Sequence, residues 1–250
     1  MINIIEKKKR LDVWLEENNF FTSRNIANSI IKNGLVKVNG KIITKSGYKV
    51  GLTDNIALIN ESIIYVSRSA LKLRYLIDRM SIDINGLSCL DIGASTGGFS
   101  QVLIEYGAKK VYAVDVGKDQ LSDTLINDDR INNMEKTDCR YLDDKIIADA
   151  DLVSVDVSFI SLKKAVYHVL NKSRSGTIFC ILFKPQFELD KRNISKNGLV
   201  KDTKLVWEKI IDFEKWLICI DVCSIRIFKS PILGKNGNQE WLVYAVKHNN

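Results

Sequence analysis

The chain has 250 residues, of which 46% are hydrophobic and 27% are charged, and its formal net charge is +7. This length is enough for a full α/β core and one small additional domain. No apolar run reaches the roughly 18 residues of a membrane span, and the first ten residues lack the apolar core of a signal peptide. The composition therefore argues against a membrane protein and predicts a cytoplasmic one.

Cysteine and histidine usage argues against disulfides and metal ligation. The five cysteines form an odd set without a C-x-x-C pair, so buried reduced thiols are expected. The two histidines, His168 and His248, lie far apart in the sequence, and no metal site is predicted.

The positive charge is concentrated near the N-terminus. Residues 1–60 hold ten Lys/Arg and five Asp/Glu, which gives +5, and the remaining residues carry only +2. Such a patch is either the electrostatic footprint of a nucleic-acid binder or an ordinary solvated face.

Two short amphipathic helices are predicted in this basic segment. Apolar residues recur at helical spacing between residues 10 and 18, and again at Ile26, Ile30 and Ile31. Thr22 or Ser23 can cap the second helix, and Asn33-Gly34 ends it.

A small β unit follows the helices. Strands 36–38 and 41–43 flank Asn39-Gly40, a strong signal for a two-residue hairpin. The order Arg10-Leu11-Asp12, Ser23-Arg24, Gly34 to Gly40 and Tyr48-Lys49-Val50 resembles the S4 RNA-binding domain over about residues 8–60.

The S4 resemblance implies contacts with structured RNA. The contact candidates are Arg10, Arg24, Lys37 and Lys41, although Arg24 could instead pair with Glu16 or Glu17. Because A-form RNA hides its base edges, these residues are expected to contact phosphates and 2′-hydroxyls.

From residue 68 onward, helix and strand patterns alternate. This alternation predicts a doubly wound, mainly parallel sheet that ends in an antiparallel hairpin, as is typical of Rossmann-like methyltransferases. Helices are predicted at 68–79, 98–106, 118–126, 161–171 and 202–216, and strands at 87–92, 110–116, 131–136, 152–157, 177–183, 218–228 and 240–247. The predicted organisation is an α+β domain at 1–60, a short ordered linker at 61–67 and an α/β domain at 68–250.

A glycine-rich turn follows the first strand of the α/β domain. The run from Asp91 to Ser100 lets the backbone approach a ligand closely, and the following helix start presents unpaired N–H groups. The spacing departs from G-x-G-x-x-G, and an acid precedes the first glycine, which favours the cationic cofactor S-adenosylmethionine over the weaker alternative NAD. The candidate cofactor-binding residues here are Asp91, Gly93, Ala94, Ser95, Thr96, Gly97, Gly98 and Phe99.

Two acids follow the next strands. Asp115 lies about 20 residues beyond the glycine turn, the spacing at which an acid accepts hydrogen bonds from a ribose. Asp138 follows the next strand and could bind the adenine amino group. Either acid could instead be a helix cap.

Asp156 and Lys184 stand at the ends of two further strands. Asp156 interrupts an apolar run, and Lys184 precedes Pro185, whose ring favours an extended chain at that point. An acid and a lysine at adjacent strand ends beside a cofactor turn favour a functional site over the alternative of two ordinary solvated residues.

Several motifs occur in an order that resembles the TlyA (haemolysin A) family, whose methyltransferase domain is similar to the FtsJ type. They are Ser67 to Leu73, Asp91 to Ser100, Ser154 to Leu162, Phe183 to Glu188 and Gln239 to Leu242. The resemblance spans nearly the whole chain. It implies 2′-O-methylation of ribosomal RNA, expected at cytidines, by a tetrad of Lys72, Asp156, Lys184 and Glu240, and it adds Arg68 as an RNA-binding candidate.

This tetrad is chemically suited to a ribose hydroxyl, which is a poor acid and must be aligned and relieved of its proton. Lys184 can act as general base or orienting group. Asp156 can hold Lys184, and Glu240 can position Lys72 or the ribose.

Other functions remain open at this stage. Base methylation is disfavoured because the sequence has neither an Asn-Pro-Pro-aromatic run nor a Pro-Cys pair. A non-catalytic RNA-binding or assembly protein and a membrane-active haemolysin are the alternatives from other classes. The partner is expected to be ribosomal RNA or a ribosomal subunit; the sequence does not indicate which nucleotide is modified or the oligomeric state.

Overall fold

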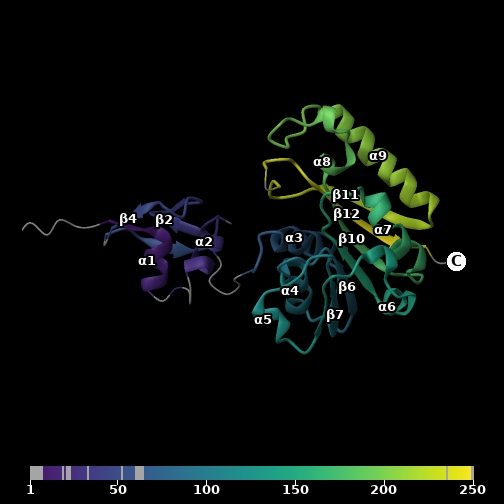
Figure 1. Ribbon diagram of the computed structural model, residues 1–250, viewed down its shortest axis with the longest axis horizontal. Helices are drawn as coiled ribbons and strands as arrows, with labels where there is room; N and C mark the ends of the chain where they lie inside the picture. The colour runs from purple at the N-terminus through teal and green to yellow at the C-terminus, as the bar shows by residue number, and fades with distance from the viewer. Residues whose placement is uncertain are drawn as a thin grey trace, which may run out of the picture. The chain divides into compact units, whose positions relative to one another are not determined.

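The computed structural model describes residues 8–18, 20, 24–32, 34–51, 53–59, 65–234 and 236–248. The chain divides into two compact units, residues 1–68 and 69–250, which are described separately (Figure 1). The predicted cap at Thr22 or Ser23 and most of the predicted linker lie outside the described residues, so the domain boundaries given above stay predictions.

The N-terminal unit packs two helices against short strands. Its elements are β1 (Lys9–Arg10), α1 (Leu11–Glu17), α2 (Arg24–Lys32), β2 (Val36–Val38), β3 (Lys41–Ile42), β4 (Lys49–Val50) and β5 (Ile56–Leu58). Strands β3, β2 and β5 form an antiparallel sheet in that order, and β1 pairs with β4. A core of Leu11, Leu15, Ala27, Ile30, Ile31, Val36, Val38 and Val50 holds the unit together.

The predicted hairpin joins β2 to β3. Val38 pairs with Lys41, and both residues between them have positive φ, 51° at Asn39 and 78° at Gly40. Asn and Gly tolerate this left-handed backbone, which the tight turn requires.

The second unit is built on a seven-stranded sheet. Its strands are β6 (Ser88–Ile92), β7 (Lys110–Val114), β8 (Ile131–Met134), β9 (Leu152–Val155), β10 (Ile178–Phe183), β11 (Val222–Lys229) and β12 (Trp241–Lys247), in the order β11-β12-β10-β9-β6-β7-β8. Strands β10, β9, β6, β7 and β8 are parallel, and β12 is antiparallel to β10 and β11. The predicted fold class is therefore confirmed, including the antiparallel last strand.

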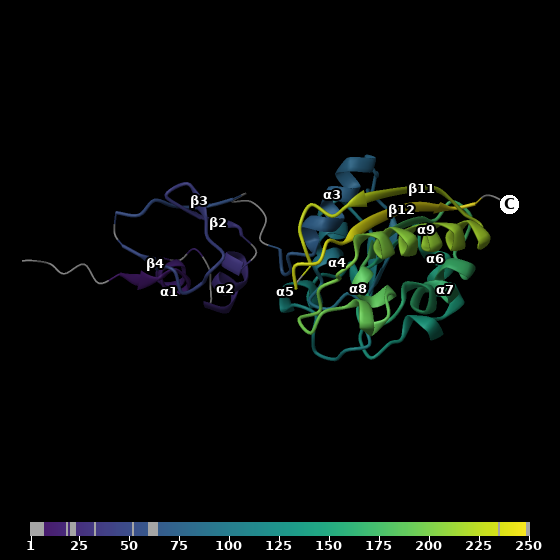
Figure 2. The same ribbon diagram turned by 90° about the horizontal axis from the view of Figure 1, so that it is seen from above.

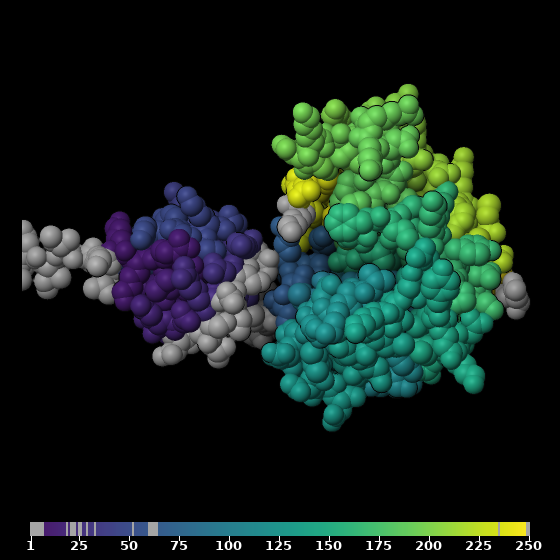
Figure 3. Space-filling model, viewed as in Figure 1, coloured from purple at the N-terminus to yellow at the C-terminus, as the bar shows by residue number. Residues whose placement is uncertain are grey.

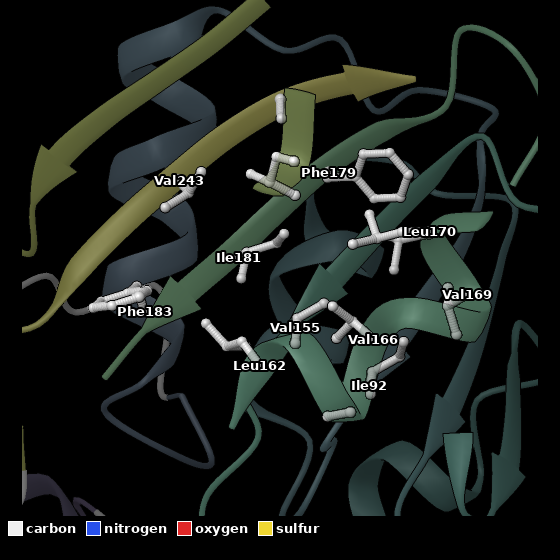
Figure 4. Close-up of a cluster of buried hydrophobic side chains, with 14 of the residues drawn as sticks. Ile92, Val155, Leu162, Val166, Val169, Leu170, Phe179, Ile181, Phe183 and Val243 are labelled. Carbon is white, nitrogen blue, oxygen red and sulfur yellow. The ribbon is translucent and has the colours of Figure 1, made fainter. Parts of the chain in front are cut away.

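Helices cover both faces of this sheet (Figure 2). They are α3 (Ala70–Met80), α4 (Gly98–Glu105), α5 (Asp123–Ile126), α6 (Asp144–Asp149), α7 (Leu162–Lys172), α8 (Pro185–Glu188) and α9 (Thr203–Cys219). Figure 4 shows α7 contributing Leu162, Val166, Val169 and Leu170 to the strand side chains Ile92, Val155, Phe179 and Ile181. Within the described residues, no helix has the length and apolar character needed to cross a bilayer.

The strand order places loops from different parts of the chain at one edge. From β6 the chain runs outward to β7 and β8, then returns to β9 on the other side of β6. In such sheets ligands bind at the carboxyl ends of the strands, where this order reverses. The loops after β6, β7 and β9 therefore meet at the predicted ligand edge.

Several helical segments differ from the sequence prediction. Helix α5 begins at Asp123 rather than near residue 118, because the carboxylate of Glu135 accepts hydrogen bonds from the N–H groups of Asp119, Gln120 and Leu121 and holds them as a loop. Helix α9 continues to Cys219, so β11 begins at Val222 rather than at residue 218. The short helices α6 and α8 were not predicted.

Candidate active site

The glycine-rich turn lies between β6 and α4 and is fixed by close backbone packing. Gly93 has φ of 79°, and a Cβ atom there would lie 2.8 Å from the carbonyl oxygen of Asp156. Gly97 has φ of 95°, and a side chain there would collide with Leu121 and Leu125. Both glycines are therefore required by this conformation.

Asp91 lies buried beneath this turn. Its carboxylate accepts hydrogen bonds from the hydroxyls of Ser100 at 2.6 Å and Ser154 at 2.8 Å. Burial raises the pKa of Asp91 to about 6, and the two serine hydroxyls oppose that rise. Asp91 was predicted as a cofactor contact, but in the structure its carboxylate supports the turn from below.

A cavity of about 530 Å³ opens beside the turn. Four of the predicted cofactor residues line it: Gly93, Ser95, Asp115 and Asp138. The wall does not include Asp91, Ala94, Thr96, Gly97, Gly98 or Phe99. The predicted catalytic residue Asp156 lines the cavity as well, whereas sequence reasoning missed further lining residues, which include Val116, Gln120, Thr137, Cys139, Arg140 and Ile160.

Asp115 is held in a fixed orientation at the end of β7. One carboxylate oxygen accepts the N–H of Ser95 at 2.9 Å, and the other accepts the N–H of Gly117 at 2.7 Å. Each oxygen keeps a lone pair for a further donor. The carboxylate therefore ties the glycine turn to the cavity wall and can still bind hydroxyl groups.

Asp138 caps a short 3₁₀ helix (η1, Cys139–Tyr141), which was the alternative role predicted for it. It accepts the backbone N–H of Arg140 and forms an ion pair with that residue's guanidinium, which lowers the pKa of Asp138. The same carboxylate lines the cavity, so capping and ligand contact are compatible here.

Lys184 and Asp156 form an ion pair beside the cavity. Asp156 follows β9 and Lys184 follows the neighbouring strand β10, so the parallel pairing brings them to the same edge. The Lys184 ammonium lies 2.6 Å from the Asp156 carboxylate and donates to the Ser158 hydroxyl at 2.8 Å. Burial raises the pKa of Asp156, while the nearby cations Lys184 and Lys72 oppose the rise.

Lys72 and Glu240 form a second, more deeply buried ion pair. The ammonium of Lys72 on α3 lies 2.5 Å from the carboxylate of Glu240, which directly precedes β12. Both residues are at most 5% exposed. Gln186 donates a longer hydrogen bond of 3.4 Å to Glu240. The structure thus brings the four predicted tetrad residues together as two ion pairs.

The segment before Glu240 packs against a second segment of the chain. Residues 189–201 lie beside residues 230–234 and 236–240, light green and yellow in Figure 3. The Asn238 side chain accepts the N–H of Val200 and donates to the carbonyl of Gly198. Gly234 lies so close to the Glu240 carboxylate that a side chain there would collide with it. These contacts fix the position of Glu240.

Phe159 presents an aromatic face next to the ion pairs. It is 91% exposed, lines the cavity, and its ring centroid lies 5.1 Å from that of Phe187. An exposed aromatic ring of this kind can stack on a nucleobase.

The RNA-binding candidates of the N-terminal unit fall into two groups. Arg10 and Arg24 both bind the fully buried carboxylate of Asp12, whose pKa they lower to about 2. Arg24 pairs there and not with the side chain of Glu16, which instead accepts its backbone N–H. Lys37 and Lys41 on the hairpin are exposed and form no ion pair within the described residues.

Arg68, the remaining RNA-binding candidate, is half-buried and is the last residue of the N-terminal unit.

Comparisons with known proteins agree with this architecture. Residues 65–247 match the FtsJ-like methyltransferase family, and residues 9–56 match the S4 domain. A Campylobacter jejuni protein named 23S rRNA (cytidine-2′-O)-methyltransferase TlyA is 39% identical and covers 90% of this chain and 95% of its own length. Hemolysin A of Brachyspira hyodysenteriae is 36% identical, covering 95% of this chain and 99% of its own.

A solved structure of a hemolysin-named protein from Streptococcus thermophilus is also similar. It superimposes with a TM-score of 0.73 at 33% identity, covering 97% of this chain and 90% of the other. The resemblances read from the sequence motifs are confirmed by these matches.

Proposed function

Because the chain belongs to the TlyA (hemolysin A) family of FtsJ-like methyltransferases with an S4 domain, we propose that it transfers a methyl group from S-adenosylmethionine to a ribose 2′-oxygen of ribosomal RNA. The family supports an S-adenosylmethionine-dependent enzyme. The observation that carries the ribose assignment is the convergence of the Lys184–Asp156 and Lys72–Glu240 ion pairs beside the cavity. Following the named relatives, the target nucleotide is proposed to be a cytidine.

The cavity has the features that S-adenosylmethionine requires. Gly93 lines the cavity, Asp115 can accept hydrogen bonds from ribose hydroxyls, and Asp138 can accept one from the adenine amino group. Val116 and Ile160 provide apolar wall area for the adenine ring. When bound, this cofactor supplies a methyl group on a positively charged sulfur, which becomes a neutral thioether.

Lys184 is proposed to handle the proton of the attacking hydroxyl. Lys184 first gives one ammonium proton to solvent. As the 2′-oxygen becomes bonded to the methyl carbon, its proton passes to the resulting amine nitrogen, which lies beside the Asp156 carboxylate and the Ser158 hydroxyl. Asp156 holds Lys184 in place. The Lys72–Glu240 pair presents fixed charges for the ribose without adding a net charge to a buried site.

RNA binding is proposed to combine three features. Lys37 and Lys41 offer exposed cations for phosphates, and Arg10 and Arg24 are held in fixed orientations by Asp12 while remaining nearly half exposed. Phe159 offers a stacking face for the target base.

The position of the transferred methyl group tests the proposal. Ribosomal subunits from cells lacking the gene are incubated with methyl-labelled cofactor, and their RNA is hydrolysed in alkali. A 2′-O-methyl group blocks the attack of the 2′-oxygen on phosphate, so the label should remain in uncut dinucleotides.

Two other results would contradict the proposal. Label found in mononucleotides would indicate base methylation. An absence of label on either subunit and on naked ribosomal RNA would favour a non-catalytic S4-type binder. The Lys184→Ala variant serves as the control, since it should bind the cofactor within a few-fold of wild type and transfer methyl roughly 10² times more slowly.

A further inference from the structure

The turn that joins β9 to α7, residues 156–161, is attached at both ends to the segment 184–188. At its first end, Lys184 contacts the Asp156 carboxylate and the Ser158 hydroxyl. At its last end, Glu188 accepts hydrogen bonds from the Ser161 hydroxyl at 2.8 Å and from the N–H of Leu162 at 2.7 Å. The turn therefore cannot shift without moving the segment that carries Lys184.

The backbone of this turn is held in an uncommon conformation. Phe159 has φ of 66°, the left-handed region that a bulky residue seldom adopts. On the other side, the backbone of Asp156 and Val157 packs against Gly93. A backbone held in a sparsely populated region needs surrounding contacts to maintain it, and such positions cluster at functional sites. Here the result is that the hydroxyl of Ser158 is placed beside the Lys184 nitrogen.

The number of hydrogens on the Lys184 nitrogen gives this hydroxyl a chemical role. Once the Lys184 ammonium has lost one proton to solvent, the neutral amine has two N–H groups and one lone pair. On the Asp156 side the nitrogen lies 2.6 Å from the carboxylate and 3.5 Å from the carbonyl oxygen, and on the other side the Ser158 hydroxyl accepts at 2.8 Å, so Asp156 and Ser158 can together take both N–H groups. The lone pair is then left to accept a proton from a third direction.

We propose that Ser158 is a positioning residue that orients the Lys184 amine, so that its lone pair faces the hydroxyl to be methylated. This inference rests on the proposed function of Lys184. Without the Ser158 acceptor, one N–H is free to rotate into the place of the lone pair. Ser158 itself acts through Lys184 and not on the cofactor.

The turn supplies a matched control for this proposal. Ser161→Ala removes a hydroxyl from the same turn, and that hydroxyl contacts Glu188 rather than Lys184. The backbone hydrogen bond from Leu162 to Glu188 remains in this variant. Ser158→Thr keeps a hydroxyl at the proposed position.

The experiment compares these variants in the full-length protein. Single-turnover methyl transfer to ribosomal subunits is measured with labelled S-adenosylmethionine, and cofactor affinity is measured by calorimetry. Ser158→Ala should lower the rate about tenfold to a hundredfold, the effect expected for a lost hydrogen bond to a group that becomes charged as it takes the proton. Cofactor affinity and the KM for the subunits should change less than about threefold, while Ser161→Ala should transfer at nearly the wild-type rate and Ser158→Thr should recover most of it.

A double variant tests whether Ser158 acts through Lys184. In a Lys184→Ala background, adding Ser158→Ala should change the residual rate less than about twofold. The proposal would be overturned if Ser158→Ala lowered the rate in that background as much as it does when Lys184 is present. Equal rates for Ser158→Ala and Ser161→Ala would also overturn it. A normal rate for Lys184→Ala would instead overturn the proposed role of Lys184, and this inference with it.

Discussion

Asp91 carries a buried charge whose effect on stability should depend on pH. Its pKa is raised to about 6 in the folded protein because burial disfavours the carboxylate. Below about pH 4 the group is protonated in both the folded and unfolded states and costs nothing. As the pH rises to about 6 the unfolded state loses this proton first, and the folded state becomes less stable by about 3 kcal/mol through this group.

The Asp91→Asn variant cannot ionise and should escape this loss. Its free energy of unfolding relative to wild type should therefore rise by up to about 3 kcal/mol between pH 4 and 7. Urea unfolding at a series of pH values measures the difference, in which the other titrating groups cancel. A difference that stays constant with pH would show that Asp91 is not the titrating group.

Asp91 also shows how much of a residue's surroundings could be predicted from the sequence. Its place before the glycine turn suggested a cofactor contact, but strand residues alternate between the two faces of a sheet. Leu90 and Ile92 belong to the core cluster that also contains α7, so Asp91 points to the opposite face. There it meets Ser100 of α4 and, in register on β9, Ser154. Alternation was visible in the sequence, whereas the serine partners were not.

Variants of the Lys72–Glu240 pair should distinguish a role in stability from a role in methyl transfer. Lys72→Met leaves a buried carboxylate without its cation, so the free energy of unfolding should fall by about 3–5 kcal/mol. Replacing both residues, as Lys72→Met with Glu240→Leu, removes the unpaired charge and should regain most of that stability. Methyl transfer should stay lost in the double variant. Recovery of both stability and transfer would mean that the pair is structural only.

At the scale of elements, the loop 117–122 depends on one carboxylate. Glu135 at the end of β8 accepts three backbone N–H groups of this loop, which lower its pKa. Two residues of the region, Val116 and Gln120, line the cavity. Glu135→Ala should release the loop and weaken cofactor binding several-fold while the rate at saturating cofactor changes little, because the loop flanks the cavity and carries none of the tetrad residues.

Calorimetry and saturation kinetics would measure the two effects separately. Glu208→Ala, on the exposed face of α9, is the matched control for the loss of one negative charge. A lower rate at saturating cofactor in Glu135→Ala would contradict a role limited to the loop.

The elements that could be predicted are those with a strong local pattern. The hairpin at Asn39-Gly40 and the parallel strands have periodicity and turn residues within a few positions. The residues of the loop at 117–122 have a helical pattern, which predicted a helix. They form a loop because of Glu135, which is more than ten residues away in the sequence. Similarly, the apolar residues 218–220 suggested a strand, but α9 continues to Cys219 with Ile220 as its C-cap, and the chain turns at Asp221, where φ is 60°.

At the scale of the whole molecule, the charge distribution assigns different tasks to the two units. Residues 1–60 carry +5 of the total charge of +7, while the unit with the cavity is nearly neutral. Binding to phosphates releases counterions, so affinity falls with salt in proportion to the number of contacts. The tetrad needs no such excess of charge, because its four residues form two neutral pairs. The salt dependence of RNA binding should therefore come mainly from the first unit.

The double variant Lys37→Gln/Lys41→Gln tests this division in the full-length chain. Both lysines are exposed on the hairpin, and each lost phosphate contact should reduce the slope of log affinity against log salt by about 0.7–0.9. Two contacts should thus lower the slope by roughly 1.5, while cofactor affinity stays at the wild-type value. The control is Lys209→Gln/Lys215→Gln, which removes the same charge from exposed positions of α9. Filter binding of ribosomal RNA at several salt concentrations gives the slopes. Equal reductions of the slope in the two double variants would mean that affinity follows net charge alone. An unchanged slope in the hairpin variant would remove Lys37 and Lys41 from the RNA interface.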